Sequence, residues 1–260
     1  MNNKLPPHKG VYLLPNLITT ASLFCAFLAL VWISRGIFES AAIAIFFAAL
    51  LDGLDGKVAR ITNTSSAFGV EYDSLADLVA FGVTPAFLLF NWQLAYYGRA
   101  GLAVCFIFVA CGAMRLARFN VTTSTTASKK FFTGLPIPAA GCTVAALVLI
   151  VPSLPKELLP YLPPFCFIMS FLLGCLMVSR VRYFSFKDFG LVKAYPLRSL
   201  VAALIVFSAV VTKPKVLAFL LLAGYVLVGL FYTALLIARS PKMPAPDKKK
   251  PASSSETGNE

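Results

Sequence analysis

The segment Asp52–Asp77, DGLDGKVARITNTSSAFGVEYDSLAD, concentrates negative charge in an otherwise apolar chain. The whole sequence has 11 acidic residues, and no acid follows this segment until Glu157. Five of the acids fall inside the segment, namely Asp52, Asp55, Glu71, Asp73 and Asp77. We therefore expect the fold and the function to be organised around these 26 residues.

The composition is typical of an integral membrane protein. Apolar residues make up 58% of the 260 residues, charged residues make up 13%, and the mean hydropathy is +0.80. A soluble domain carries about 25% charged residues. The net charge is +12, but the basic residues lie mostly between apolar runs, which suits a membrane surface or a phosphate-bearing substrate better than nucleic acid. We therefore expect an all-α, polytopic helix bundle that contacts membrane lipids and binds no nucleic acid.

About 20 apolar residues cross a bilayer as a helix. The sequence offers about eight such segments, at residues 14–34, 38–59, 70–92, 99–119, 137–153, 160–178, 197–212 and 215–238. The last residues, 240–260, are rich in Pro, Lys, Ser and Glu, and such a composition cannot bury a core. We therefore divide the chain into a membrane domain, residues 1–239, and a disordered polar tail, residues 240–260.

The distribution of Lys and Arg predicts the orientation. Eight spans place both termini on the same side, and that side collects 18 of the 23 basic residues. Because basic residues are retained on the cytoplasmic side of a membrane, both termini and the acidic segment are predicted to face the cytoplasm.

Helical geometry predicts that four of the five acids converge. Residues on a helix are about 100° apart, so Asp52 and Asp55 project about 60° apart, and Asp73 and Asp77 project about 40° apart. If the two helices are neighbours, they can close four aspartates around one point. Gly56 and Ala59 fall on the same face as Asp52, so the smallest side chains line the space beside the carboxylates.

Four carboxylates in a membrane need compensating charge, because each one costs about 2.5–3.5 kcal/mol to insert. Lys57 and Arg60 can neutralise two at most. Ligation by carboxylate oxygens alone suits Mg²⁺ or Mn²⁺. A structural ion-pair cluster and a proton or cation pathway remain as alternatives. The single histidine, His8, lies in the polar N-terminal tail, which argues against histidine-based nucleophilic chemistry.

The pattern Asp52-x2-Asp55-Gly56-x2-Ala59-Arg60-x8-Gly69-x3-Asp73-x3-Asp77 resembles the signature of the CDP-alcohol phosphatidyltransferase family at every fixed position. The family's core of about six spans would cover most of residues 10–200. Three further strings resemble the bacterial members of this family that use L-serine: DSLADLVAFGVTPA at 73–86, RLARFN at 115–120 and FTGLPIP at 132–138.

The resemblance implies a reaction in which CDP-diacylglycerol and L-serine give phosphatidylserine and CMP. It also implies two divalent cations, Mg²⁺ or Mn²⁺, held by Asp52, Asp55, Asp73 and Asp77. Asp77 is then the general base that takes the proton of the serine hydroxyl during a direct displacement. For such a protein we expect the bacterial inner (cytoplasmic) membrane and a homodimer.

The resemblance assigns roles around the nucleotide as well. Gly56 and Ala59 would let it approach the helix, Arg60 and Gly69 would help to seat the phosphates, and Asp55 would serve both metal and nucleotide. At the start of the first span, Asn16 and Thr19 are candidates for nucleotide contact. An N-terminal cap of the first helix is an equally good interpretation of Asn16.

Basic residues after the fourth span are candidates for binding the acceptor. Arg115 and Arg118 are three residues apart, so they share a helical face and can form a fork for a carboxylate or a phosphate. Lys130 follows downstream as a weaker candidate. The alternative interpretation of these residues is a positively charged anchor at the membrane surface.

Two other functions stay open. The first keeps the chemistry and changes the acceptor to glycerol 3-phosphate, inositol phosphate or choline. The second is a cation-coupled transporter that uses the aspartates as ion ligands. A transporter predicts repeats in both halves of the chain, whereas the acids are confined to one half and no repeat is visible.

Overall fold

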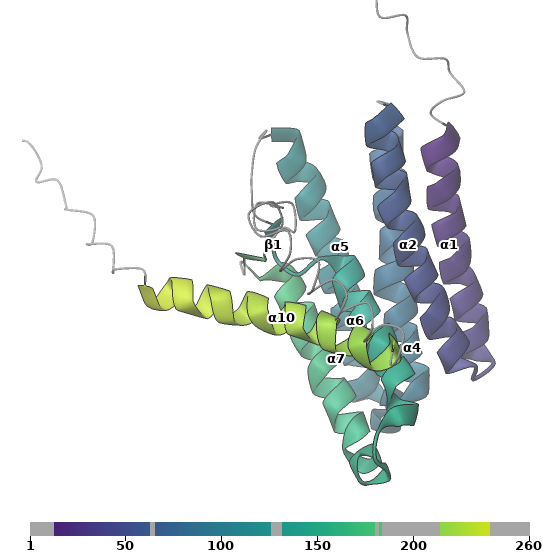
Figure 1. Ribbon diagram of the computed structural model, residues 1–260, viewed down its shortest axis with the longest axis vertical. Helices are drawn as coiled ribbons and strands as arrows, with labels where there is room; N and C mark the ends of the chain where they lie inside the picture. Colours follow the sequence, from purple (N-terminus) through teal and green to yellow (C-terminus); the bar gives the residue numbers. More distant parts are fainter. Residues whose placement is uncertain (1–12, 63–65, 126–131, 180–181, 184–213, 240–260) are drawn as a thin grey trace, which may run out of the picture.

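The computed structural model describes residues 13–62, 66–125, 132–179, 182–183 and 214–239, which form a bundle of helices (Figure 1). The elements, in chain order, are α1 (Leu13–Ser34), α2 (Phe38–Thr62), α3 (Ala67–Asp77), the π-helical segment η1 (Leu78–Val83), α4 (Thr84–Trp92), the 3₁₀ turn η2 (Leu94–Tyr97), α5 (Arg99–Thr125), β1 (Phe132–Thr133), α6 (Ile137–Ile150), the 3₁₀ segments η3 (Val151–Ser153) and η4 (Lys156–Tyr161), α7 (Leu162–Val178), β2 (Arg182–Tyr183) and α10 (Pro214–Arg239). Within these ranges the strands make one two-stranded antiparallel pair, β1 with β2. The all-α prediction is confirmed.

The described helices include several that can span a membrane. Four stretches are long and apolar enough, namely Leu14–Ser34, Ala67–Trp92, Arg99–Val121 and Lys156–Val178, and two shorter apolar helices cover Ile137–Ser153 and Pro214–Gly229. α2 has sufficient length at 25 residues but carries five charged residues. The chain is therefore a polytopic helical membrane protein. The predicted span 197–212 lies outside the described residues, so the count of eight stays a prediction.

The third span runs without interruption through α3, η1 and α4. It begins at Ala67 rather than at the predicted residue 70, because the Ser66 hydroxyl accepts a hydrogen bond from the Gly69 N–H at 3.0 Å and caps the helix. The helix widens into the π-helical segment η1 directly after Asp77, and the Thr84 hydroxyl donates to the Val79 carbonyl at 2.8 Å. Such wide turns are often found at functional sites.

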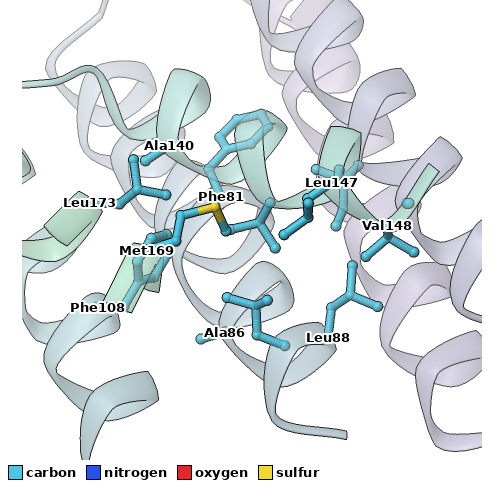
Figure 2. Close-up of a cluster of buried hydrophobic side chains, with 14 of the residues drawn as sticks. Phe81, Ala86, Leu88, Phe108, Ala140, Leu147, Val148, Met169 and Leu173 are labelled. Carbon is cyan, nitrogen blue, oxygen red and sulfur yellow. The ribbon is translucent and has the colours of Figure 1, made fainter. Parts of the chain in front are cut away.

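The apolar core lies directly behind this wide turn. Figure 2 shows Phe81 of η1 and Phe108 of α5, both fully buried, among side chains from α4, α6 and α7. A methyl group on Gly141 of α6 would come within 3.0 Å of the Phe81 backbone, so α6 packs against η1 almost backbone to backbone. Close packing against α6 therefore fixes the position of the segment after Asp77.

The direction of the helices places the acidic segment at one end of the bundle. In Figure 1, α1 begins, α2 ends and α5 ends at the upper end of the view. α1 contacts both α2 and α3. α10 crosses the bundle in front of α6 in this view and does not follow the direction of α1 and α2.

Candidate active site

α1 holds the acidic end of α2 through two hydroxyl groups. The Thr19 hydroxyl donates to Oδ2 of Asp55 at 2.7 Å, and the Pro15 carbonyl lies 3.1 Å from the same hydroxyl. One turn further along α1, the Ser22 hydroxyl donates to the Ala48 carbonyl at 2.9 Å. Asp55 is only 5% exposed, so the Thr19 bond satisfies one oxygen of a buried carboxylate and fixes its direction.

The aspartates of α2 and α3 converge, as the helical projection predicted. One carboxylate oxygen from each of Asp52, Asp55 and Asp73 lies within 4.8 Å of the other two. The carboxyl group of Asp77 lies within hydrogen-bonding reach of Asp52. Carboxylates this close repel one another unless they share a proton or a cation.

The donor set fits a hard divalent cation. Three carboxylate oxygens are ligands of the kind that Mg²⁺ and Mn²⁺ prefer. Oxygens on opposite sides of a Mg²⁺ ion lie about 4.2 Å apart, so oxygens within 4.8 Å of one another are close to a coordinating arrangement. Asp77 borders the group on the Asp52 side, where it can complete a second cation site or act as a base.

Open backbone adjoins the carboxylates on α2. A methyl group built on Gly53 would meet no atom within 4 Å, and one built on Gly56 would meet only the Arg60 guanidinium at 4.0 Å. Nε of Arg60 donates to the Gly56 carbonyl at 2.7 Å, which holds the guanidinium over this surface. Gly56 therefore leaves space for a bulky group near Asp52, and the Arg60 guanidinium places a positive charge beside that space.

Gly69 is different, because its space is already filled. A methyl group there would lie 3.1 Å from the Ser66 hydroxyl and 3.2 Å from Oδ1 of Asn16. Gly69 thus lets α3 approach α1. The Asn16 side chain reaches toward Gly69 from the first turn of α1. Because α1 begins at Leu13, Asn16 lies within the helix, and the interpretation of Asn16 as a helix cap is wrong.

The remaining predicted residues lie as follows. Ala59 is half-buried on α2, one residue before Arg60. Lys130 lies outside the described residues. Arg115 and Arg118 both lie on α5 but in different surroundings, because Arg115 is half-buried and Arg118 is exposed.

Arg115 is the arginine that the structure brings toward the aspartates. Its guanidinium lies within electrostatic range of Asp77. Its Nε atom is shielded from solvent, and no described group accepts a hydrogen bond from it. A shielded donor without a partner, beside a candidate base, is suited to binding an anionic group of a ligand.

Sequence reasoning missed a polar link between α3 and α5. The Asn120 amide donates to Oε2 of Glu71 at 3.2 Å and to the Ser74 hydroxyl at 3.1 Å. Between α1 and α3, the hydroxyls of Thr20 and Tyr72 lie 2.9 Å apart. Asn120 was visible as the end of the RLARFN string, whereas nothing in the sequence pairs Tyr72 with Thr20.

Comparison with known proteins identifies relatives over nearly the whole chain. The sequence model described as CDP-alcohol phosphatidyltransferase matches residues 12–181. A Helicobacter pylori protein named CDP-diacylglycerol–serine O-phosphatidyltransferase is 37% identical over 240 residues, which cover 90% of this chain and 96% of that protein. A protein of the same name from Methanocaldococcus jannaschii is 40% identical over 54% of this chain and 61% of its own length. Another, from Saccharomyces cerevisiae, is 48% identical over 38% of this chain and 36% of its own length.

Proposed function

Since the chain belongs to the CDP-alcohol phosphatidyltransferase family, we propose that it transfers the phosphatidyl group of CDP-diacylglycerol to L-serine, giving phosphatidylserine and CMP. The observation that carries this proposal is the convergence of Asp52, Asp55 and Asp73 beside an open glycine surface, with Asp77 next to them. The relatives named for the serine reaction supply the acceptor.

The donor lies against the carboxylate face of α2. Phe47, Leu50 and Leu54 are 55%, 58% and 41% exposed on this helix, but they project about 140–160° from Asp52 and lie on the side away from the carboxylates. The acyl chains of the donor stay in the surrounding lipid, because apolar chains prefer an apolar medium to water. The nucleotide then lies over Gly56 and Ala59, with its phosphates under Arg60 and near the carboxylates.

Asp52, Asp55, Asp73 and Asp77 hold two divalent cations, Mg²⁺ or Mn²⁺. When bound, such ions neutralise the charge that develops on the leaving phosphate. The protein's own contribution is to fix the ligands: Thr19 orients Asp55, and Asn120 ties Ser74 and Glu71 of α3 to α5. These bonds keep the carboxylates of two helices at one point.

Asp77 acts as the general base. The hydroxyl oxygen of L-serine forms a bond to the phosphorus that carries diacylglycerol, and the bond from that phosphorus to the bridging oxygen breaks. CMP leaves with the electron pair, and the hydroxyl proton passes to the Asp77 carboxylate. Arg115, which lies within electrostatic range of Asp77, binds the carboxylate of the acceptor.

The purified full-length protein in detergent with CDP-diacylglycerol and Mn²⁺ tests this proposal. Addition of L-serine should release CMP and form phosphatidylserine, and addition of EDTA should stop both. Glycerol 3-phosphate, inositol phosphate and choline serve as comparison acceptors. CMP release with one of these and none with L-serine would falsify the serine assignment while keeping the chemistry.

We also propose the arrangement in the cell. Basic residues flank the same ends of the helices as the carboxylates, including Lys57, Arg60, Arg115 and Arg118. The site and both termini therefore face the cytoplasm of the bacterial inner membrane. Residues 1–239 form the membrane domain, residues 240–260 form a polar tail, and two copies of the chain associate. Labelling of single added cysteines near each terminus in intact and opened cells checks the orientation.

A further inference from the structure

The wide turn η1 joins two parts of the third span that have different tasks. Upstream of the turn, α3 carries Asp73 and Asp77 toward α2. Downstream, α4 packs Ala86 and Leu88 into the core (Figure 2) and exposes Phe87. Because each residue of a helix adds a fixed rotation, the register between the two parts decides whether both faces point correctly.

An uninterrupted α-helix would set these two parts against each other. Leu75, just before Asp77, is 64% exposed and projects about 160° from it. Phe87 of α4 is 38% exposed, and at about 100° per residue it would project only about 80° from Asp77. The two exposed side chains would then lie about 120° apart, and Asp77 would stand beside an exposed face instead of opposite to it.

The wide turn removes this conflict. A π turn closes with a hydrogen bond to the fifth residue back rather than to the fourth, so it contains about one residue more than an α turn. One extra residue rotates the downstream part by about 100°, which places Phe87 about 180° from Asp77 and within about 20° of Leu75. The exposed face is then continuous along the span, and Asp77 lies opposite to it, on the side where α2 supplies Asp52.

Thr84 holds the wide turn. Its backbone N–H and its hydroxyl both donate to the Val79 carbonyl, the hydroxyl at 2.8 Å. In an α register the same N–H would donate to Ala80 instead. Thr84 is fully buried, so water does not compete for these donors. The next residue, Pro85, has no N–H and therefore cannot form an α-type bond to the Phe81 carbonyl.

α6 leaves room for the widened backbone. A methyl group on Gly141 would lie 3.0 Å from both the Cα atom and the carbonyl oxygen of Phe81, so a larger residue would press on the turn. The packing of α6 and the two bonds of Thr84 thus favour the same register.

We infer that Thr84 is a positioning residue which, by holding the wide turn, aims the carboxylates of Asp73 and Asp77 at α2. The inference rests on the proposed function, since it takes Asp77 as the general base and Asp73 as a cation ligand. It adds a determinant of turnover in the apolar core. Thr84 acts through the backbone of the span rather than by contact with a substrate.

The substitution Thr84→Val tests the inference, because valine keeps the shape of threonine and the backbone N–H and removes the hydroxyl. We expect kcat at saturating Mn²⁺ to fall about fivefold, the effect of one hydrogen bond on the register of the turn. The KM for L-serine should change less than about twofold, because Arg115 lies on another helix, α5. Thr84→Ser retains the hydroxyl and should keep kcat within about twofold of the unaltered protein.

Thr143→Val is the matched control. Thr143 of α6 is 4% exposed, and its hydroxyl donates to the Ala139 carbonyl at 2.7 Å, within an ordinary α-helical turn. Both substitutions remove a buried hydroxyl from a helix, so they should lower thermal stability by similar amounts. Only Thr84→Val should lower kcat.

The outcomes separate the inference from the proposed function. An unchanged kcat in Thr84→Val, an equal fall in Thr143→Val, or a Thr84→Ser variant as slow as Thr84→Val overturns the inference. If CMP is released with another acceptor, the serine assignment fails and the same comparison is made with that acceptor.

If the unaltered protein releases CMP with no acceptor, the proposed function fails, and Mn²⁺ alone tests the inference. A cation that binds the folded protein raises its Tm. This rise should be smaller in Thr84→Val than in Thr143→Val, because the carboxylates of α3 are then misdirected. Equal rises in the two variants would overturn the inference.

Discussion

The donor side and the acceptor side of the site are built in opposite ways. The donor side uses Asp52, Asp55 and Asp73, which lie in a single short stretch of chain on two consecutive helices. The acceptor side uses Arg115 of α5, which lies far along the sequence from the aspartates and is half-buried within electrostatic range of Asp77. The difference suggests that the chemical step is encoded locally, whereas the choice of acceptor depends on how distant helices pack.

Asp77→Asn should have the largest effect, because it removes the proposed base and retains the shape of the side chain. We expect kcat to fall by about 10²–10⁴-fold, the range for general base catalysis. CDP-diacylglycerol should still bind, since the group of Asp52, Asp55 and Asp73 is intact. Steady-state CMP release and a direct measurement of donor binding separate the two effects.

Glu71→Gln is the matched control for that substitution. Glu71 lies on the same helix, is exposed and accepts a hydrogen bond from Asn120 rather than facing the aspartates. The glutamine amide oxygen can still accept this bond, so the turnover of Glu71→Gln should stay within about twofold of the unaltered protein. Near-normal turnover of Asp77→Asn would exclude the base role and assign Asp77 to cation binding alone.

The two arginines of α5 test the acceptor side directly. Arg115→Ala should raise the KM for L-serine by about 10- to 100-fold, because a hydrogen bond to a charged group contributes about 1.5–3 kcal/mol. Arg118→Ala should raise it less, because Arg118 is exposed and lies one turn nearer the end of the helix. Initial rates over a range of L-serine concentrations measure both. If Arg118→Ala raised the KM for L-serine more than Arg115→Ala does, the acceptor site would lie nearer the membrane surface than we propose.

Gly56→Val probes the open surface on the donor side. The added side chain has free space in the protein, with only Arg60 at 4.0 Å, so the fold should tolerate it. It would occupy the place of the nucleotide, and we expect the KM for CDP-diacylglycerol to rise about tenfold, the cost of a misfitted contact of about 1–3 kcal/mol. Titration of the donor at saturating L-serine measures this effect.

Gly53→Val is the comparison for Gly56→Val. Gly53 is equally open, but it projects about 100° from Asp52 on the helix, whereas Gly56 projects about 40° from it. Its effect on the donor's KM should therefore be smaller. Equal effects from both substitutions would show that the open surface, rather than the carboxylate face, sets donor affinity.

The donor side could be predicted because its aspartates recur at helical spacing within one short segment, Asp52–Asp77. Two helices with acids three or four residues apart can bring their carboxylates together, and the structure brings three of the four within 4.8 Å of one another, with Asp77 next to Asp52. The wide turn at Leu78–Val83 could not be predicted in this way, because it depends on the close contact of Gly141 with Phe81. The cap interpretation of Asn16 failed because α1 already includes the three residues before it, with Pro15 in the first turn, where proline is tolerated.

The acceptor side could be predicted only in part. Two arginines one turn apart on a helix were visible as a fork, but the sequence does not say which of them turns inward. The structure decides this through burial, since Arg115 is half-buried and Arg118 is exposed. The burial of Arg115 could not be found from periodicity, which carries no information about contacts between distant helices.

Thr19→Val should have the smallest effect and tests how firmly the donor side is held. Valine keeps the shape of threonine and removes the hydroxyl that donates to Asp55 at 2.7 Å. Loss of one hydrogen bond contributes about 1 kcal/mol, so the Mn²⁺ concentration for half-maximal activity should rise about fivefold. The kcat at saturating Mn²⁺ should change little, because Asp55 itself is retained. Thermal stability with increasing Mn²⁺ gives an independent measurement of the same shift.

Ser22→Ala tests whether the Thr19 hydroxyl acts by orienting the Asp55 carboxylate or only by holding α1 against α2. The Ser22 hydroxyl donates to the Ala48 carbonyl, one turn away from Thr19, and touches no carboxylate. Its loss should lower thermal stability without changing the Mn²⁺ requirement. If Ser22→Ala shifts the Mn²⁺ requirement as much as Thr19→Val does, then helix contact alone positions Asp55. The donor side would then depend on long-range contacts as much as the acceptor side does.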